Sequence, residues 1–332
     1  MTKSSTIRVI LFALLGAILL QFFSYAFRGG YWFEKNCIYD RTARLAAFDN
    51  ETPGQIEVLN LGDSLSICAL IPPELFREYG ITAYNLGQDM QFPVESYHAL
   101  KHAVETQPIK VVLLETNGLF YENTLVDEGI KTLSEFLQST FPFLRYHNLW
   151  KMLFKHKNIR TYFKGYTIND VTNDFTFDEE YNYHNDEFFP VEPQQYLQLK
   201  RICSLCERNG IKLILYSSAS IRNYYTMRKR NTLLKICSEN HLDFVDANYD
   251  IGLVGIDWNT DTWDDGDHLN LSGARKMTTY LGNYLSTNCK ALTDHRGDPS
   301  YHSWDEMLKV YDEEVVKMKG TNYSILENEL GF

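Results

Sequence analysis

The sequence predicts an α/β protein, a three-layer α/β/α sandwich with a mostly parallel sheet, preceded by one apolar N-terminal helix. Two observations carry the layered part: short apolar runs alternate with helical patterns along most of the chain, and several of these runs lack the polar alternation of a half-exposed strand. The third observation is a stretch of 19 uncharged residues, 9–27, near the N-terminus.

The N-terminal segment, 1–28, is predicted to be a membrane anchor. Lys3 and Arg8 precede the apolar stretch, so we expect the N-terminus inside a bacterial cell membrane, with a single pass and an extracytoplasmic body. A cleaved signal peptide is the alternative, because Ser24-Tyr25-Ala26 resembles a small-x-small cleavage site. The bulky phenylalanines around that site favour the uncleaved anchor.

The rest of the chain is long enough for one large domain. Of its 332 residues, 44% are hydrophobic, which suffices for a sizeable core. The net charge of -11 argues against a nucleic-acid partner, since an acidic surface cannot replace phosphate counterions. We expect a linker at 29–54, the domain at 55–289 and a C-terminal tail at 290–332.

Strand and helix patterns follow one another in the order expected of parallel crossovers. The predicted strands are 56–61, 81–86, 110–114, 211–216 and 243–248. The predicted helices are 72–79, 94–106, 194–209, 227–240 and 272–285.

Two stretches interrupt this order. Residues 119–192 are rich in aromatic residues, Asn and Asp, and are interpreted as an insertion of helices and loops over the site. The tail, 290–332, is expected to carry a helix near 304–316.

The six cysteines do not define a metal or redox centre. Cys203 and Cys206 have CxxC spacing, but they fall in a helical pattern without a second pair, and buried small side chains are the better interpretation. An extracytoplasmic body would permit disulfides, whose pairing the sequence leaves open. We expect neither a metal nor a cofactor.

The strand ends carry the residues that matter for chemistry. Ser64 follows the first predicted strand, Gly87 the second and Asn117 the third, while His268 precedes the last helix of the domain. Ligands of parallel sheets bind beyond the carboxyl ends of the strands. These four residue types at one sheet edge are the parts of an acyl-transfer site.

Each part has a physical role in that chemistry. Ser64 is the candidate nucleophile and His268 its general base, because a serine hydroxyl needs a neighbouring base at neutral pH. Asp265 is the predicted third member, with Asp264 and Asp267 as rivals. The N–H groups of Ser64 and Gly87 and the side-chain amide of Asn117 are the predicted oxyanion donors.

In these residues the chain resembles the SGNH, or GDSL, hydrolase superfamily. Its first block matches Gly62-Asp63-Ser64-Leu65-Ser66, its second the glycine at 87, and its fifth, Asp-x-x-His, falls on 265–268. Its third block, Gly-x-Asn-Asp, falls on 115–118, where the Asn is kept and both flanking residues differ. The resemblance covers roughly 55–288 without the insertion and implies a Ser-His-Asp acyl hydrolase.

A narrower resemblance concerns architecture. One N-terminal anchor, an outward GDSL-like domain and the sequence 268–274, "HLNLSGA", resemble membrane-anchored proteins of bacterial envelope acylation, such as the D-alanyl transfer protein of lipoteichoic acid synthesis and the alginate O-acetylation proteins. This resemblance implies acyl transfer to or from an envelope glycan beside a membrane-bound O-acyltransferase partner.

Two other functions stay open at this point. The domain could be a non-catalytic partner that binds a glycan or an acyltransferase through a degenerate site. It could also be a lipase or thioesterase for long acyl chains, which a wide apolar groove beside Ser64 would favour and a polar, aromatic-lined cleft would oppose.

Overall fold

The computed structural model describes residues 3–26, 29–30, 41–147, 160–173, 185–221 and 224–330. Its centre is a five-stranded sheet in which every neighbouring pair is parallel, in the order β2-β1-β3-β4-β5. The strands are β1 (Val58–Leu61), β2 (Ala83–Asn85), β3 (Val111–Glu115), β4 (Lys212–Ser217) and β5 (Asp243–Asp246).

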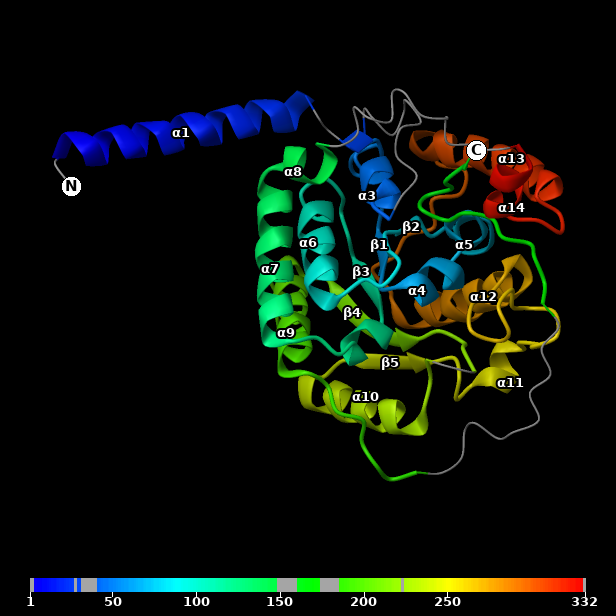
Figure 1. Cartoon of the computed structure of the whole chain (residues 1–332). Helices are drawn as coiled ribbons and strands as arrows, with labels where there is room; N and C mark the ends of the chain where they lie inside the picture. The colour runs from blue at the N-terminus through cyan, green and yellow to red at the C-terminus, as the bar shows by residue number, and fades with distance from the viewer. Residues whose placement is uncertain are drawn as a thin grey trace.

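Helices cover both faces of this sheet (Figure 1). One face packs mainly against α3 (Ala43–Phe48), α6 (Pro93–Ala103), α9 (Pro193–Asn209) and α10 (Met227–Asn240). The other packs against α4 (Ser64–Ala69), α5 (Pro72–Tyr79), α11 (Ile251–Val254) and α12 (Leu271–Asn288). The predicted three-layer α/β/α architecture is confirmed.

The continuous apolar runs of the strands are explained by burial on both faces. In β3, Val112 and Leu114 belong to one core cluster, while Val111 and Leu113 belong to the other. Successive side chains of a strand point to opposite faces, so a strand covered on both sides needs apolar residues at every position.

The order of the strands places the site. The chain proceeds from β1 outward to β2 and then returns to the other side of β1 with β3. The carboxyl ends of β1 and β3 therefore lie side by side at the point where the winding direction reverses, with Leu61 paired in register with Leu114. Ligand sites of such sheets form in the crevice at this reversal.

The connection between β3 and β4 carries additional elements: η1 (Asn117–Phe120), α7 (Leu125–Thr140) and α8 (Pro142–Tyr146). The insertion predicted at 119–192 falls on this connection, and part of its aromatic run lies outside the described residues. Of the described part, residues within 160–169 line a cavity that adjoins α4, whereas α7 and α8 pack beside α6 at the edge of the body.

The predicted linker at 29–54 requires a correction. Its later part forms the short helix α3, whose Ala43, Ala46 and Phe48 are buried, and Phe48 packs edge-on against Tyr84 of β2 with ring centroids 4.9 Å apart. A helix of six residues is too short to produce a recognisable periodicity, so the sequence alone did not separate it from a linker.

The C-terminal tail also packs into the body. It contains η3 (Pro299–Tyr301), α13 (His302–Lys317) and α14 (Tyr323–Leu330), and α13 covers the stretch where a helix was predicted. Trp304 and Tyr311 of α13 are fully buried, and the Trp304 ring lies 5.2 Å from that of Phe76 in α5.

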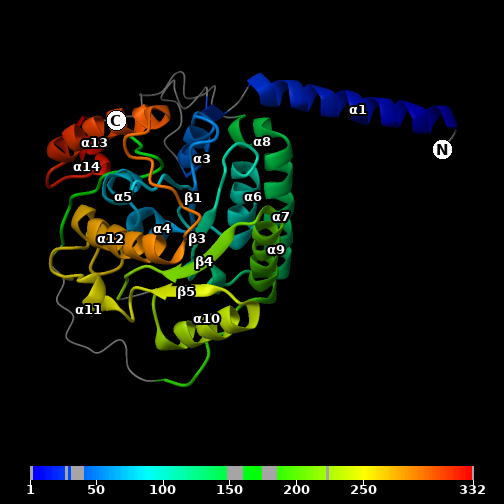
Figure 2. The ribbon, with the colours of Figure 1, turned by 180° about the vertical axis from the view of Figure 1, so that it is seen from behind.

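The N-terminal helix, α1 (Lys3–Ala26), is the one described helix that is long and apolar enough to cross a membrane. It extends away from the body on the side where α7 and α8 lie (Figures 1 and 2). Its composition fits either a membrane span or a signal sequence.

The described cysteines are free thiols, and Cys37 lies outside the described residues. Cys203 and Cys206 are buried on α9 among the apolar side chains of the core, as the sequence predicted for them. Burial raises the pKa of the Cys206 thiol to about 12.

Candidate active site

A sharp turn joins β1 to α4 and presents Ser64 at the start of the helix. Gly62 in this turn has φ +135°, and a Cβ atom there would lie 2.6 Å from Cβ of Glu115. Only glycine fits this conformation and this contact. The Gly62 N–H donates to Oε1 of Gln91 at 2.9 Å, which satisfies a buried donor in the turn.

Asp63 holds the turn from within. Its buried carboxylate accepts hydrogen bonds from the Leu65 N–H at 2.9 Å, the Asn117 side-chain amide at 2.7 Å and the Tyr121 hydroxyl at 2.5 Å. Asp63 is therefore the N-cap of α4. Ser64 is the first residue of α4, so its own N–H has no acceptor within the helix.

Ser64, His268 and Asp264 form a hydrogen-bonded chain. The half-buried Ser64 has its Oγ 2.7 Å from Nε2 of His268. On the other side of the ring, Nδ1 of His268 contacts Oδ2 of Asp264, whose second oxygen accepts the backbone N–H of His268 at 2.6 Å. A hydroxyl, an imidazole and a carboxylate are thus joined by hydrogen bonds in the order that serine acyl transfer requires of a nucleophile, its base and the group that orients the base.

The prediction of Asp265 as the third member is wrong. Asp265 has φ +62° and Gly266 has φ +92°, so two consecutive residues adopt left-handed conformations and close a tight loop before His268. The loop is held by bonds from the Gly266 N–H to Thr262 Oγ1 and from the Ile221 N–H to the Gly266 carbonyl. This curvature brings Asp264, four residues before the histidine, to the ring in place of Asp265.

The environment of His268 favours the protonated imidazole. Burial would lower the pKa of His268, but the hydrogen bond and charge of Asp264, with the charges of Asp63 and Asp267, outweigh it and raise that pKa above its ordinary value. The ring of Trp263 lies 5.7 Å from the imidazole. An imidazolium formed during catalysis would therefore be stabilised by a neighbouring carboxylate.

Gly87 lies directly against this turn. A Cβ at this position would be 2.1 Å from Oγ of Ser66 and 3.0 Å from the carbonyl oxygen of Gly62, so a side chain has no room there. Its N–H makes only a long contact, 3.4 Å, with Oδ1 of Asn85. The proximity agrees with the predicted role of Gly87, whose action as an oxyanion donor stays a prediction.

Asn117 also lies at the site, but its amide is engaged. One N–H of Nδ2 donates to Asp63, and Oδ1 accepts a bond from Nζ of Lys229 at 3.2 Å. A side-chain amide carries two N–H groups, so one donor remains beside the bond to Asp63. The oxyanion role of Asn117 stays a prediction, as does that of the Ser64 N–H.

Glu115, two residues before Asn117, is part of a buried charged group. Its Oε2 accepts the Asn117 N–H at 2.9 Å, and burial together with the charge of Asp63 raises its pKa well above the ordinary value. Lys229 is the cation of this group, and burial lowers its pKa although Glu115 and Asp63 oppose that shift. Sequence reasoning missed Lys229 and Tyr121, because neither belongs to a recognisable motif.

A cavity of about 370 Å³ adjoins α4, and its lining includes neither Ser64 nor His268. It contains Ile67 and Cys68, which lie three and four residues after Ser64 and hence on the same side of α4. The remainder of its lining is largely polar, cationic or aromatic and comprises Arg41, Arg44, Asp89, Arg160, Tyr162, Tyr166, Thr167, Asn169, Trp263 and Leu269. The cavity therefore offers polar groups and aromatic rings to a ligand.

Arg44 is the most unusual member of this lining, because it is only 8% exposed. Its Nε donates to the carbonyl oxygen of Gly165 at 2.7 Å, and no carboxylate of the described residues pairs with it. By contrast, Arg41 pairs with Glu95, and Arg160 pairs with Glu327. A buried guanidinium that has no carboxylate partner can still donate hydrogen bonds to a bound ligand.

No model of a known protein family matches this chain, and no curated protein matches its sequence. Among solved structures, the chain is similar to a lipase/acylhydrolase from Enterococcus faecalis, with 10% identity, coverage of 72% of this chain and 98% of the other, and a TM-score of 0.37. It is also similar to an inferred acylhydrolase from Bacteroides fragilis, with 14% identity, coverage of 74% and 95%, and a TM-score of 0.38.

A third similar structure is an inferred GDSL-like lipase from Parabacteroides merdae, with 11% identity, coverage of 71% and 98%, and a TM-score of 0.34. The chemistry assigned to the site therefore has to rest on the site's own geometry.

Proposed function

We propose that the protein is a GDSL-type serine esterase or O-acyltransferase that acts on ester-linked acyl groups. The observation that carries the proposal is the hydrogen-bonded chain from Ser64 through His268 to Asp264, set on a Gly-Asp-Ser turn at the carboxyl end of β1. Each of the three groups has the partner that its role demands.

The reaction follows from this arrangement. Oγ of Ser64 attacks the ester carbonyl while its proton passes to Nε2 of His268, and a C–O bond forms to the serine. The tetrahedral intermediate collapses, the C–O bond to the leaving alcohol breaks, and His268 returns the proton to that alcohol. Water or a second hydroxyl then attacks the acyl-enzyme, with His268 as the base again, and releases Ser64.

The oxyanion of the intermediate needs donors that are fixed in advance. The N–H of Ser64 at the start of α4, the N–H of Gly87 and the free N–H of the Asn117 amide are the groups we assign to this task. Tyr121 and Lys229 act through their neighbours: Tyr121 bonds Asp63, and Lys229 bonds Oδ1 of Asn117, so both are positioning residues.

The substrate is proposed to be an acylated glycan of the cell envelope. The polar cavity that adjoins α4, with Arg44 and the rings of Tyr162 and Trp263, supports a hydroxyl-rich or anionic substrate. It opposes a lipase or thioesterase for long acyl chains, which would need an apolar groove. The apolar α1 supports a single-pass anchor. We further propose that the body is extracytoplasmic and works beside a membrane-bound acyltransferase.

One observation favours a different function. Glu115 stands where the family has glycine, and the Asn117 amide is already bonded to Asp63, so the third block is altered. A protein with such a block could bind a glycan or an acyltransferase without catalysis. The two functions differ in whether Ser64 is activated.

Covalent labelling with a fluorophosphonate probe tests this difference in the full-length protein in membranes. We expect the wild type to be labelled and the Ser64→Ala and His268→Ala variants to remain unlabelled. A folded wild type that stays unlabelled in membranes, with its native partners present, would contradict the catalytic proposal and favour the binding role.

A further inference from the structure

The helix α7 exposes an apolar face to solvent. Its exposed large side chains are those of Leu125, Val126, Ile130, Leu133 and Phe136, which are 72%, 70%, 63%, 58% and 54% exposed. At 100° per residue these five positions fall within an arc of about 140°. The apolar residues therefore form one continuous stripe along the outside of α7.

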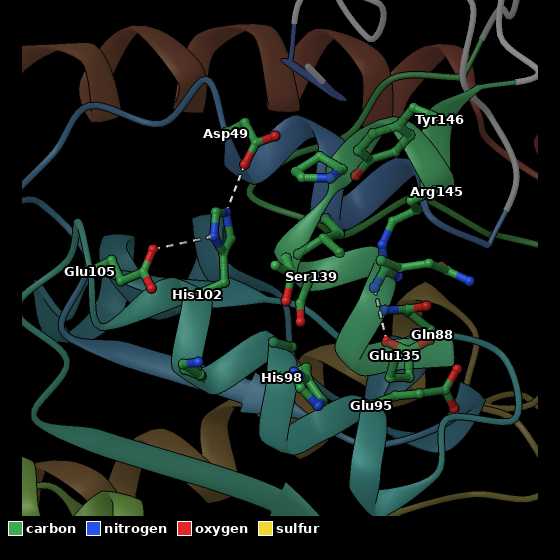
Figure 3. Close-up of a pocket in the computed structure, with 16 residues that line it drawn as sticks. Asp49, Gln88, Glu95, His98, His102, Glu105, Glu135, Ser139, Arg145 and Tyr146 are labelled. Atoms are coloured by element: carbon green, nitrogen blue, oxygen red, sulfur yellow. Dashed lines mark hydrogen bonds and ion pairs between the residues drawn. The ribbon is translucent and has the colours of Figure 1, made fainter. Parts of the chain in front are cut away.

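The inward side of the same helix is charged. The buried residues of α7 are Glu128 and Glu135, and Glu135 bonds Arg145 of α8 at 2.8 Å. Lys131, between them on the same side, pairs with Glu95 of α6 at 3.3 Å. Glu95, Glu135 and Arg145 line a cavity of about 310 Å³ between α6, α7 and α8, where Glu135 and Arg145 face each other (Figure 3).

The apolar and charged sides of α7 are thus the reverse of those of an ordinary surface helix in water. Such a helix normally buries its apolar stripe in the core and turns its charges to solvent. Here the ion pairs hold the polar side against the body, and the apolar stripe faces outward. An exposed apolar stripe of this kind marks a surface that contacts another apolar phase.

We propose that the outer face of α7 lies on the lipid bilayer and docks the body onto the membrane surface. The proposal rests on the anchoring role of α1 in the proposed function. The C-terminal end of α1 packs on α8, where the rings of Phe23 and Phe143 lie 5.5 Å apart and the Phe143 N–H donates to Oγ of Ser24. The helix α8 in turn packs against α7.

The arrangement of the helices fits this occupant. The helix α1 leaves the body on the side whose edge is formed by α7, and α7 runs across the direction of α1 in both views (Figures 1 and 2). If α1 crosses the bilayer, α7 lies along the membrane plane with its apolar stripe toward the lipid. This is the position of an interfacial amphipathic helix.

The absence of charged residues from the apolar stripe of α7 predicts how it contacts lipid. The charged residues of α7 are Asp127, Glu128, Lys131 and Glu135, and none of them lies within the apolar arc. Binding therefore depends on burial of apolar side chains between the headgroups, without a cationic patch for anionic lipids. Contact with lipid should be equal in phosphatidylcholine and in anionic membranes and should not weaken at high salt.

Photolabelling tests the proposal with the full-length protein in nanodiscs of phosphatidylcholine that carry a lipid-linked diazirine. We expect labelled peptides from α1 and from 125–137 of α7. The double variant Ile130→Glu/Leu133→Glu should lower the labelling of α7 about tenfold and leave that of α1 unchanged, because two side chains can no longer enter the apolar phase.

The matched controls are Leu253→Glu on α11 and Val316→Glu on α13, which replace side chains that are 78% and 76% exposed on other faces. They should leave α7 labelling intact, and circular dichroism checks that all variants are folded. If α1 is labelled and α7 is not, the docking of α7 on the bilayer is contradicted, whereas the anchoring role of α1 stands. Labelling of neither helix would overturn the anchor as well.

A second experiment tests whether lipid, and not a protein, contacts the apolar stripe of α7. The same chain with a photoreactive side chain at 130, expressed in native membranes, should cross-link to lipid. A protein adduct at that position in place of lipid would overturn the proposal and assign the stripe to a membrane-protein partner.

Discussion

The carboxylate behind His268 shows how much one residue position matters. Asp264 contacts both the ring and the backbone N–H of His268, and its hydrogen bond is the largest contribution that raises the pKa of that histidine. Asp265, the next residue, sits in the left-handed conformation that closes the loop. Two adjacent acids thus have different tasks, one toward the base and one in the turn.

Replacement of Asp264 by Asn should lower kcat/KM for an ester substrate by about 10³- to 10⁴-fold, because the imidazole loses its orienting carboxylate. The pKa of His268 should fall, so the rise of kcat/KM with pH should move to lower pH. A pH profile of both enzymes measures this shift. The control Asp265→Asn should keep the wild-type inflection and most of the activity, and an equal loss in that control would contradict the role of Asp264.

Lys229 is the second residue whose surroundings predict a measurable effect. It is the cation beside Glu115 and Asp63, so Lys229→Met should leave two buried carboxyl groups without a counter-charge and lower the free energy of unfolding by about 3 kcal/mol at neutral pH. Burial and the charge of Asp63 raise the pKa of Glu115 in the folded state. The protonated Glu115 therefore contributes stability at low pH, and this contribution is lost as the pH rises through the pKa of Glu115 in the folded protein.

The deficit of Lys229→Met should consequently be smaller at acidic pH than at neutral pH, because a protonated Glu115 needs no counter-charge. Thermal unfolding at several pH values measures it, with Lys235→Met as the matched control, since the Lys235 side chain is 61% exposed. A deficit that does not change with pH would show that Lys229 acts only through packing.

At the scale of elements, the turn between β1 and α4 places Ser64 at the start of the helix. Gly62→Ala forces a Cβ atom to 2.6 Å from Cβ of Glu115 at φ +135°. We expect a loss of about 2–4 kcal/mol in the free energy of unfolding, from the left-handed conformation and the overpacking together. Urea denaturation in detergent measures this loss.

The control for this turn is Gly252→Ala in α11, where the added Cβ meets nothing within 4 Å. Alanine is the better residue inside a helix, so this change should be neutral or stabilise by about 0.5–1 kcal/mol. If the two variants are equally stable, the close contact with Glu115 is not the reason why position 62 requires glycine.

At the scale of the whole molecule, the C-terminal helix α13 belongs to the core. Trp304 is fully buried between Phe76 and the side chain of Lys164, whose Nζ lies 4.7 Å from the centre of the indole ring. Trp304→Ala should cost about 3–5 kcal/mol of unfolding free energy through the cavity it leaves. The exposed Leu253→Ala should change stability by less than about 0.5 kcal/mol.

The Trp304→Ala variant also tests whether α13 affects the reactivity of Ser64 as well as the stability of the fold. Trp304 does not contact the Ser64–His268–Asp264 chain in any described interaction, so the variant should still react with the fluorophosphonate well below its melting temperature. Loss of labelling in a variant that is still folded would show that α13 acts on the site as well as on the core.

Much of this molecule follows from local sequence pattern. The helices at 72–79 and 227–240 begin and end where predicted, and all five strands lie within the predicted runs or one residue from them, because apolar runs and Pro or Gly boundaries are local signals. Ser64, Gly87, Asn117 and His268 were identified because each lies next to such a boundary. Their contacts agree with a common site at the sheet edge.

The sequence by itself thus determined the parallel α/β/α architecture, the apolar N-terminal helix and the residue types at the strand ends. Only the tertiary structure decided which acid reaches His268, that Lys229 and Tyr121 join the site, that α3 and α13 belong to the core, and that α7 turns its apolar side outward. The reason is that hydropathy and turn residues act over a few neighbours in the chain. Loop curvature, burial of a charge and the orientation of a helix depend instead on contacts with other segments of the chain, such as those of Ile221 with Gly266, Lys229 with Asn117 and Lys131 with Glu95.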